Sequence, residues 1–113
     1  MNVLRGEIWW AELDPIRGSE QAGTRPVLIF QNDNISRLTP TVLAIPLTTN
    51  LRRARMPFCV SISEGNGGLT NSSVVLCNQI RVLDKVRLRG RLGHVDDLTM
   101  IEVEDCVLFT MGM

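Results

Sequence analysis

Glu7-Ile8-Trp9-Trp10-Ala11-Glu12-Leu13 and Val27-Leu28-Ile29-Phe30 are rich in aromatic and branched apolar residues, and a polar segment at residues 15–26 separates them. Both runs predict strands. Hairpin loops usually have about two to five residues, so this longer connection indicates a binding or active-site loop. Pro26 biases Arg25 toward an extended backbone. We therefore expect a functional loop whose end holds Arg25 in a defined position.

Short apolar runs separated by turn residues continue along the chain. They predict further strands at residues 42–48, 58–62 and 73–80, and a short one at 89–94. Pro46 lies within the first of these, and it indicates an edge or a bulge because proline cannot donate a ladder hydrogen bond. Five or six short strands joined by glycine-containing turns favour a small β-barrel.

Two helices are expected beside the strands. Asn34 is a candidate N-cap for a short helix at residues 36–38, and Asp96 is one for a C-terminal helix that ends before Gly112. The C-terminal helix has a broad apolar sector, formed by Leu98, Ile101, Val103, Cys106, Val107, Leu108 and Phe109. This sector is wider than a small barrel needs, so we expect it to pack on the barrel or on a second subunit.

Length and composition limit the class of protein. The 113 residues suit one domain, residues 1–113, and no apolar run approaches the ~20 residues that span a bilayer. Without the apolar core of a signal peptide, the sequence predicts a soluble cytoplasmic protein.

Cys59, Cys77 and Cys106 are expected to be small buried hydrophobes. His94 is the only histidine, and we interpret it as structural. No zinc or magnesium motif is present, so we expect no metal and no cofactor.

Charge is distributed unevenly along the chain. Residues 1–36 carry a net −2, residues 37–91 a net +7, and residues 92–113 a net −5. Arginine accounts for eleven of the twelve basic residues, and its planar guanidinium suits phosphate and acidic groups. The basic middle is interpreted either as scattered solvated charge or as a patch for nucleic acid or an acidic protein, and the sequence leaves these alternatives open.

Several short motifs follow one another in a specific order. They are Arg5-Gly6-Glu7-Ile8, Gly18-Ser19-Glu20-Gln21, Arg25-Pro26, Gln31-Asn32-Asp33, Pro46-Leu47-Thr48-Thr49, Gln79-Ile80-Arg81 and Asp84-Lys85-Val86-Arg87-Leu88. In this order the chain resembles, over nearly its whole length, the MazF/PemK family of toxins, the endoribonucleases of bacterial toxin–antitoxin pairs. The resemblance implies a mainly β fold, an SH3-like barrel of the CcdB/PemK type with appended helices, and a homodimer.

The resemblance also implies an activity. Toxins of this family cleave single-stranded RNA at short sequence motifs without a metal ion, leaving 2′,3′-cyclic phosphate and 5′-hydroxyl ends, and a cognate antitoxin neutralises them. RNA supplies its own nucleophile, the 2′-hydroxyl, so the enzyme must position the chain, stabilise the phosphorane and move protons. An acidic antitoxin tail would lie across the basic face or displace the Ser19-Glu20-Gln21 loop.

By the same resemblance, individual residues receive roles. Arg25 would stabilise charge at the scissile phosphate, a role that suits a guanidinium because it is permanently cationic. Thr48 would donate a hydrogen bond to the same phosphate, and Glu20 would act as general base or orient the arginine. The expected contacts to bases and sugars come from short polar side chains: Ser19, Gln21, Asn32, Thr49, Asn78 and Gln79.

Two other functions are considered beside the ribonuclease. A CcdB-like poison would bind DNA gyrase without enzymatic activity, and a non-catalytic module would bind nucleic acid only.

Trp9 and Trp10 are adjacent in a strand, so their rings point to opposite faces. One ring can fill the core while the other meets a dimer partner or a base, and the small number of aromatic residues favours core and interface.

Overall fold

The computed structural model describes residues 2–13 and 23–113. The strands and helices are β1 (Glu7–Glu12), β2 (Thr24–Ile29), α1 (Asp33–Ser36), β3 (Thr41–Thr48), β4 (Cys59–Ile62), β5 (Ser73–Leu76), β6 (Arg81–Asp84), β7 (Leu88–His94) and α2 (Asp97–Thr110). Short 3₁₀ turns join some of them: η1 (Leu51–Arg55), η2 (Asn66–Gly68), η3 (Cys77–Gln79) and η4 (Lys85–Arg87).

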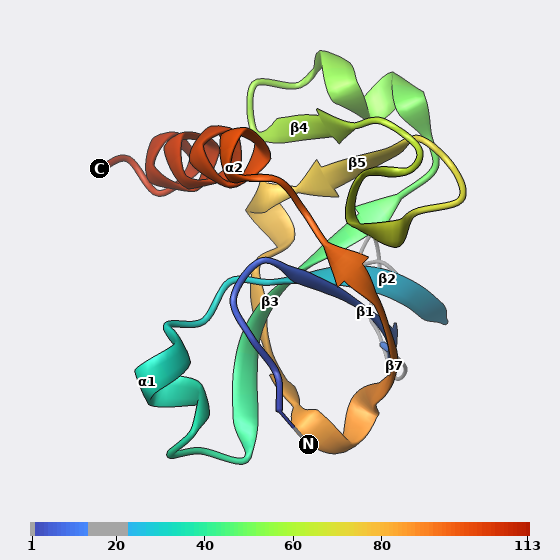
Figure 1. The fold of residues 1–113 in the computed structure, drawn as a ribbon. Helices are drawn as coiled ribbons and strands as arrows, with labels where there is room; N and C mark the ends of the chain where they lie inside the picture. The colour runs from blue at the N-terminus through green and yellow to red at the C-terminus, as the bar shows by residue number, and fades with distance from the viewer. Residues whose placement is uncertain (1, 14–22) are drawn as a thin grey trace.

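The strands form one antiparallel sheet that curls into a barrel (Figure 1). The hydrogen-bonded order is β4-β5-β3-β2-β1-β7, and β6 pairs with the first half of β3. The turn η4 leads from β6 to β7, but no ladder joins these two strands in the described part of the chain. The expected mainly β, SH3-like fold is confirmed, with the barrel open between β6 and β7.

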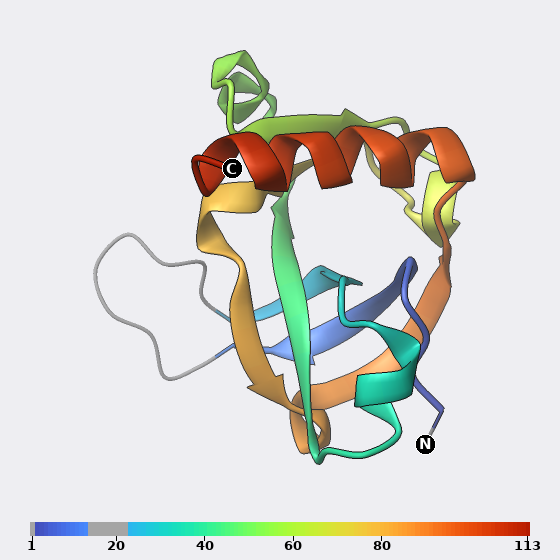
Figure 2. The ribbon, with the colours of Figure 1, turned by 90° about the vertical axis from the view of Figure 1, so that its left-hand side faces the viewer.

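Two buried clusters lie on the two faces of the curled sheet. One fills the barrel and includes Trp9, Val27 and Ala44, whereas the other lies under α2 and includes Ile8, Leu28 and Ile45. Neighbouring residues of one strand enter different clusters because side chains alternate between the two faces. Figure 2 shows α2 lying across the molecule beside β4, where it closes the second cluster.

The helix α2 begins as expected and buries only part of its apolar surface. The Asp96 side chain accepts a hydrogen bond from the Thr99 N–H at 2.8 Å. Hydrogen bonds from the Thr99 side chain and backbone lower the pKa of Asp96. The buried apolar positions are Met100, Val103, Cys106 and Val107, while Leu98, Ile101, Leu108 and Phe109 are exposed. The apolar sector is therefore wider than the barrel covers, as the sequence predicts.

Cysteine burial agrees with the sequence prediction for two of the three residues. Cys77 and Cys106 are buried, Cys59 is half-buried, and all are free thiols. Burial raises the pKa of the Cys77 thiol, with the neighbouring Cys106 thiol adding to the effect. Both buried groups are therefore packed as small hydrophobes.

None of the described helices has the length and hydropathy needed to cross a membrane.

The strand predicted at residues 73–80 is wrong in its second half. β5 ends at Leu76, Cys77–Gln79 form η3, and a separate strand β6 follows at Arg81–Asp84. The polar pair Asn78-Gln79 interrupts the apolar run and allows the chain to turn. β6 was not predicted, because Val82 is 62% exposed and only Leu83 enters the core, which leaves no clear alternation in so short a segment.

Pro46 does not mark an edge strand. β3 is central, because it pairs with β2 along one side and with β6 and then β5 along the other. The Phe30 N–H donates to the Leu43 carbonyl, so alternation directs the backbone N of Pro46 away from β2. On the side of β3 that faces away from β2, the β6 ladder ends at Ala44 and the β5 ladder begins at Leu47. The proline therefore occupies the gap between two ladders.

The short helix begins earlier than the sequence suggests. Asn32, and not Asn34, is the N-cap of α1, and its side-chain oxygen accepts from the Asn34 N–H at 2.8 Å. The prediction was wrong because both asparagines are good N-cap residues, and the local sequence does not distinguish between them. Asn34 instead accepts a hydrogen bond from Arg37.

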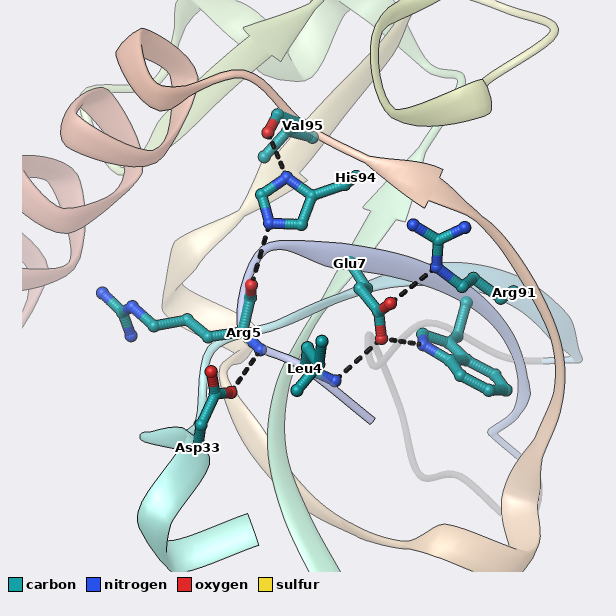
Figure 3. Close-up of polar contacts among 8 residues, drawn as sticks. Leu4, Arg5, Glu7, Asp33, Arg91, His94 and Val95 are labelled. Atoms are coloured by element: carbon teal, nitrogen blue, oxygen red, sulfur yellow. Dashed lines mark hydrogen bonds and ion pairs between the residues drawn. The ribbon is translucent and has the colours of Figure 1, made fainter. Parts of the chain in front are cut away.

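A polar cluster joins the start of β1 to α1, β7 and α2, and we call it the N-terminal polar cluster: Leu4, Arg5, Glu7, Asp33, Arg91, His94, Val95 and Glu104 (Figure 3 shows all but Glu104). The Arg5 guanidinium donates to the Phe30 carbonyl, pairs with Glu104 and lies 4.4 Å from the Phe30 ring centre. Both ring nitrogens of His94 face backbone carbonyls, those of Val95 and Arg5. These are the contacts of a structural histidine.

Glu7 is the buried centre of this cluster. Its carboxylate accepts from the Leu4 N–H at 2.7 Å, the Trp9 indole at 3.1 Å and Arg91 at 2.6 Å. Burial by itself raises the pKa of Glu7, but these three hydrogen bonds together outweigh it and lower the pKa below the usual value. Glu7 therefore stays ionised while being 5% exposed, which ties β1 to β7 through Arg91.

Candidate functional site

Arg25 and Thr48 lie on facing strands at one end of the β2–β3 ladder. The last ladder pair is Val27 with Pro46, and Arg25 and Thr48 are each two residues beyond this pair on their strands. Alternation puts both side chains on the barrel-core face, with Val27 and Ala44. Arg25 is half-buried, and Thr48 is 8% exposed. The predicted catalytic pair thus lies where the barrel core ends.

Thr48 is held by its own turn. Its hydroxyl oxygen accepts from the Asn50 N–H at 3.2 Å, and Asn50 in turn caps η1 by accepting from the Arg52 N–H. A threonine hydroxyl has one donor hydrogen in addition to its lone pairs. The contact to Asn50 uses a lone pair and leaves that hydrogen available, so Thr48 can donate to an anion while its position stays fixed.

A cavity of about 220 Å³ lies beside the first residues of β2. Arg25 and Pro26 border it from β2, Trp10 from β1 and Thr49 from the end of β3. Trp10 is 40% exposed, although it pairs with Pro26 and with Gly90 in the middle of the sheet. An exposed tryptophan next to a cationic side chain is an uncommon surface feature, and it identifies this cavity as the candidate binding site.

The far wall of the cavity comes from residues 68–73 and from β7. Gly68 has a φ of +76°, and a Cβ there would lie 2.1 Å from the Leu92 carbonyl oxygen. Only glycine allows this backbone contact, which holds the segment after η2 against β7. Leu92 is skipped in the β1–β7 register, as expected for a bulge, and its side chain lines the cavity.

The remaining predicted site residues divide into three groups. Thr49 is exposed and borders the cavity, whereas Asn78 and Gln79 lie in η3, between the two strands that share β3. Asn32 lies elsewhere, because it caps α1 and borders a separate hollow with Arg5 and Arg37. The loop residues Ser19, Glu20 and Gln21 lie outside the described residues.

Two residues near the cavity were not among the site residues predicted from the sequence. Trp10 was interpreted mainly as core or interface, but Trp9 is the buried ring and Trp10 borders the cavity. Arg87 donates to the Glu12 carbonyl at 3.2 Å, so its cation lies beside the strand pair that carries Arg25. Arg87 belongs to the motif Asp84–Leu88, which was the available signal.

The basic middle of the chain is mostly exposed. Arg37, Arg52, Arg55 and Arg89 have exposed side chains, and Arg91 pairs with Glu7. In residues 2–13 and 23–113, no three His, Cys, Asp or Glu side chains are grouped so that they could hold a metal ion. The basic residue that borders the cavity is Arg25, and a guanidinium suits phosphate oxygens.

Comparisons with known proteins identify the family of the chain. Residues 4–110 match the family described as PemK-like, MazF-like toxin of type II toxin–antitoxin system. The chain is 38% identical over 113 residues to endoribonuclease EndoA of Bacillus subtilis, covering 100% of this chain and 97% of that protein.

Solved structures share the fold over the whole chain. MazF from Deinococcus radiodurans has a TM-score of 0.86 at 27% identity, covering 100% of this chain and 99% of that one. An endoribonuclease in complex with its cognate antitoxin, from a mycobacterial species, has a TM-score of 0.82 at 29% identity, covering 98% and 96%. The chain therefore belongs to the PemK-like, MazF-like toxins of type II toxin–antitoxin systems.

Proposed function

We propose that this protein is a sequence-specific endoribonuclease toxin that cleaves single-stranded RNA without a metal ion, with Arg25 and Thr48 at the scissile phosphate. Family membership and a relative named as an endoribonuclease support the activity. The observation that supports the site is the register of β2 and β3, which brings Arg25 and Thr48 to the same end of the ladder, where Arg25 borders an open cavity. The relatives do not favour the CcdB-like gyrase poison or the non-catalytic module.

The reaction needs positioning and charge stabilisation. The 2′-oxygen attacks the adjacent phosphorus and loses its proton to a base, while the bond from phosphorus to the 5′-oxygen breaks and that oxygen gains a proton. The products are a 2′,3′-cyclic phosphate and a 5′-hydroxyl. Arg25 stabilises the added negative charge on the phosphorane oxygens, and Thr48 donates a hydrogen bond to the same group. The substrate carries the nucleophile, so no protein nucleophile is required.

The other predicted residues complete this proposal. Glu20 is proposed as the general base or as the group that orients Arg25. Ser19, Gln21, Thr49, Asn78 and Gln79 are proposed to contact bases and sugars, because short polar side chains suit the edges of unstacked bases. Asn32 is proposed as a further RNA contact, reached from its exposed position at the α1 cap.

Partners follow from the relatives. A mycobacterial relative is described in complex with its cognate antitoxin, and we propose that this chain too is neutralised by an antitoxin. The exposed arginines of residues 37–91 suit an acidic antitoxin segment. The exposed apolar residues of α2 support a homodimer. We propose that the protein acts in the cytoplasm, where messenger RNA is available.

The test is cleavage of a long unstructured RNA by the purified protein in excess EDTA, with mapping of cut sites and end groups. We expect discrete cuts with 2′,3′-cyclic phosphate and 5′-hydroxyl ends, absent from the Arg25→Ala variant. Val82→Ala is the control, because Val82 is exposed on β6 and does not border the cavity. This control should cut like the wild type.

Other outcomes would point to the alternatives. Intact RNA together with inhibition of gyrase supercoiling would support the gyrase poison. Stable RNA binding without product would support the non-catalytic module. Cleavage that stops in EDTA and returns with a divalent ion would overturn the metal-independent mechanism.

A further inference from the structure

We propose that the cavity bordered by Trp10 is a base-binding subsite, in which one unstacked nucleobase of the RNA stacks on the Trp10 ring. This inference rests on the proposed function, because the ligand is a nucleotide next to the phosphate held by Arg25. Beyond that function, a nucleobase is proposed to fill the cavity and Trp10 is proposed to bind this base.

The environment of Trp10 leaves its ring open to a ligand. Trp9 is 8% exposed in the barrel core, whereas Trp10 is 40% exposed on the other face. The cross-strand neighbours of Trp10 are Pro26 and Gly90. Gly90 has open space within 4 Å of where a Cβ would stand, so this position supplies nothing that covers the ring. The sheet therefore presents an indole with a rigid apolar edge at Pro26 and an open side at Gly90.

The size and lining of the cavity suit one base. Its volume of about 220 Å³ lies below the roughly 300–1,000 Å³ typical of sites for larger organic ligands. Leu69 and Leu92 add apolar surface beside Trp10, while Thr70 and Asn71 add polar groups at the wall. A nucleobase has the same division, with an apolar face for stacking and a polar edge for hydrogen bonds.

Asn71 is the side chain best placed to read that edge. Its amide nitrogen donates to the Thr70 hydroxyl at 3.3 Å, and Ser73 donates to the Asn71 backbone carbonyl at 2.9 Å. These two contacts fix the turn before β5. The exposed amide still has its carbonyl oxygen and a second N–H for a ligand, the donor and acceptor pair that base edges require.

The wall stays in place because of a backbone contact. Gly68 and Gly93 pack directly on the backbone of the other segment, and a Cβ on Gly93 would lie 2.7 Å from the Gly67 carbonyl group. Residues 69–71 are thereby held opposite the sheet. The distance between Trp10 and this wall is then set by the fold and not by the ligand, as expected for a preformed subsite.

Arg25 connects the subsite to the chemistry. It borders the cavity and is adjacent in β2 to Pro26, the cross-strand neighbour of Trp10. Alternation directs the Arg25 side chain to the barrel-core face and the Trp10 ring to the other face, but both residues border the cavity at this end of the sheet. An RNA chain that passes this end can therefore place a phosphate at Arg25 and the base of a neighbouring nucleotide on the indole. Stacking on Trp10 would hold the RNA backbone at this point and contribute to its sequence preference.

The test compares Trp10→Ala and Trp10→Phe with the control Val82→Ala, which truncates an apolar side chain that is 62% exposed on β6 and not part of the cavity. KM and kcat are measured on an RNA that the wild type cuts. Stacking is worth about 1–3 kcal/mol per base, so Trp10→Ala should raise KM roughly 5- to 150-fold. Trp10→Phe should restore most of the affinity, and Val82→Ala should leave KM unchanged.

Intrinsic fluorescence gives an independent readout. A non-cleavable RNA with a 2′-deoxy nucleotide at the cut site should quench the wild-type emission, because the base contacts Trp10. The quenching should disappear in the Trp10→Phe protein, which retains only the buried Trp9. This variant also keeps the test valid if Trp10→Ala fails to fold.

The failure of this inference differs from the failure of the proposed function. A wild type that cuts RNA, with unchanged KM in folded Trp10→Ala and no Trp10-dependent quenching, would overturn the subsite and leave the nuclease intact. If the wild type does not cut, the proposed function fails. The fluorescence titration then still decides whether Trp10 stacks on a base, and the absence of quenching would overturn the subsite.

Discussion

Two regions of the molecule contain arginines from family motifs, and their surroundings differ. In the N-terminal polar cluster, Arg5 contacts the Phe30 carbonyl, the Phe30 ring and Glu104. At the end of the β1–β2 hairpin, Arg25 borders a cavity together with Trp10 and Thr49. The cluster is built from groups that contact one another, whereas the cationic, aromatic and hydroxyl groups at the hairpin end border a cavity and are proposed to bind a ligand. A motif residue therefore supports either fold or chemistry, and its contacts distinguish the two.

The largest expected effect is the loss of cleavage rate when Arg25 at the hairpin end is removed. Arg25→Ala should lower kcat by about 10²–10³-fold, because removal of one preformed group that stabilises the charge of a transition state has that effect. Thermal unfolding should stay within a few degrees of the wild type, because Arg25 is only half-buried and lies outside the two buried hydrophobic clusters. The variant is assayed at saturating RNA. Full activity in a folded Arg25→Ala protein would place the chemistry elsewhere.

Thr48→Val should have the next largest effect. The change keeps the shape and removes the hydroxyl, so a hydrogen bond to the charged phosphate worth about 1.5–3 kcal/mol is lost, which corresponds to roughly 10- to 150-fold in kcat. The Asn50 N–H loses its acceptor, but Asn50 is exposed and water can replace the oxygen. Thr48→Ser, which keeps the hydroxyl, should retain most of the rate. Equal losses in both variants would indicate a packing role.

Glu7→Gln tests the other region through stability. The neutral amide would weaken three hydrogen bonds and leave Arg91 without its carboxylate partner. We expect the free energy of unfolding to fall by about 1–3 kcal/mol. Urea denaturation at neutral pH measures this change. A fully stable Glu7→Gln protein would show that the cluster does not hold β1 to β7.

The smallest expected effect is the pH dependence of that stability. The pKa of Glu7 is lowered in the folded protein from the usual value of 4.5. The carboxylate therefore contributes stability above about pH 4.5, and this contribution is lost as the pH falls through the lowered folded-state pKa. Urea midpoints measured from pH 6 downward should fall more steeply in the wild type than in Glu7→Gln. Parallel curves would contradict the assignment.

Much of the fold could be predicted from the sequence where local signals agree with tertiary structure. The apolar run of β1 and the Asp96 cap of α2 are examples, because alternation and capping act over a few residues. β6 and the position of Pro46 could not be predicted. Both depend on which strands share β3, and that pairing is set by contacts between distant segments.

The site was predictable only in part for the same reason. The family motifs pointed to Arg25 and Thr48, but their positions at the same end of the ladder follow from the β2–β3 register. The cavity was not predicted, since its wall at residues 68–73 meets Trp10 only through the packing of Gly68 against β7. Glycine in a turn and tryptophan in a strand have ordinary structural explanations, and the sequence alone does not bring them together.

The most direct test of the central claim is the single-turnover cleavage rate, at saturating RNA and per folded molecule, of Arg25→Ala and Glu7→Gln measured side by side with the wild type. The account predicts a loss of about 10²-fold or more for Arg25→Ala and a rate within about twofold of the wild type for Glu7→Gln. Similar losses in both variants, or no loss in Arg25→Ala, would contradict the assignment of chemistry to the hairpin end and of structure to the N-terminal polar cluster.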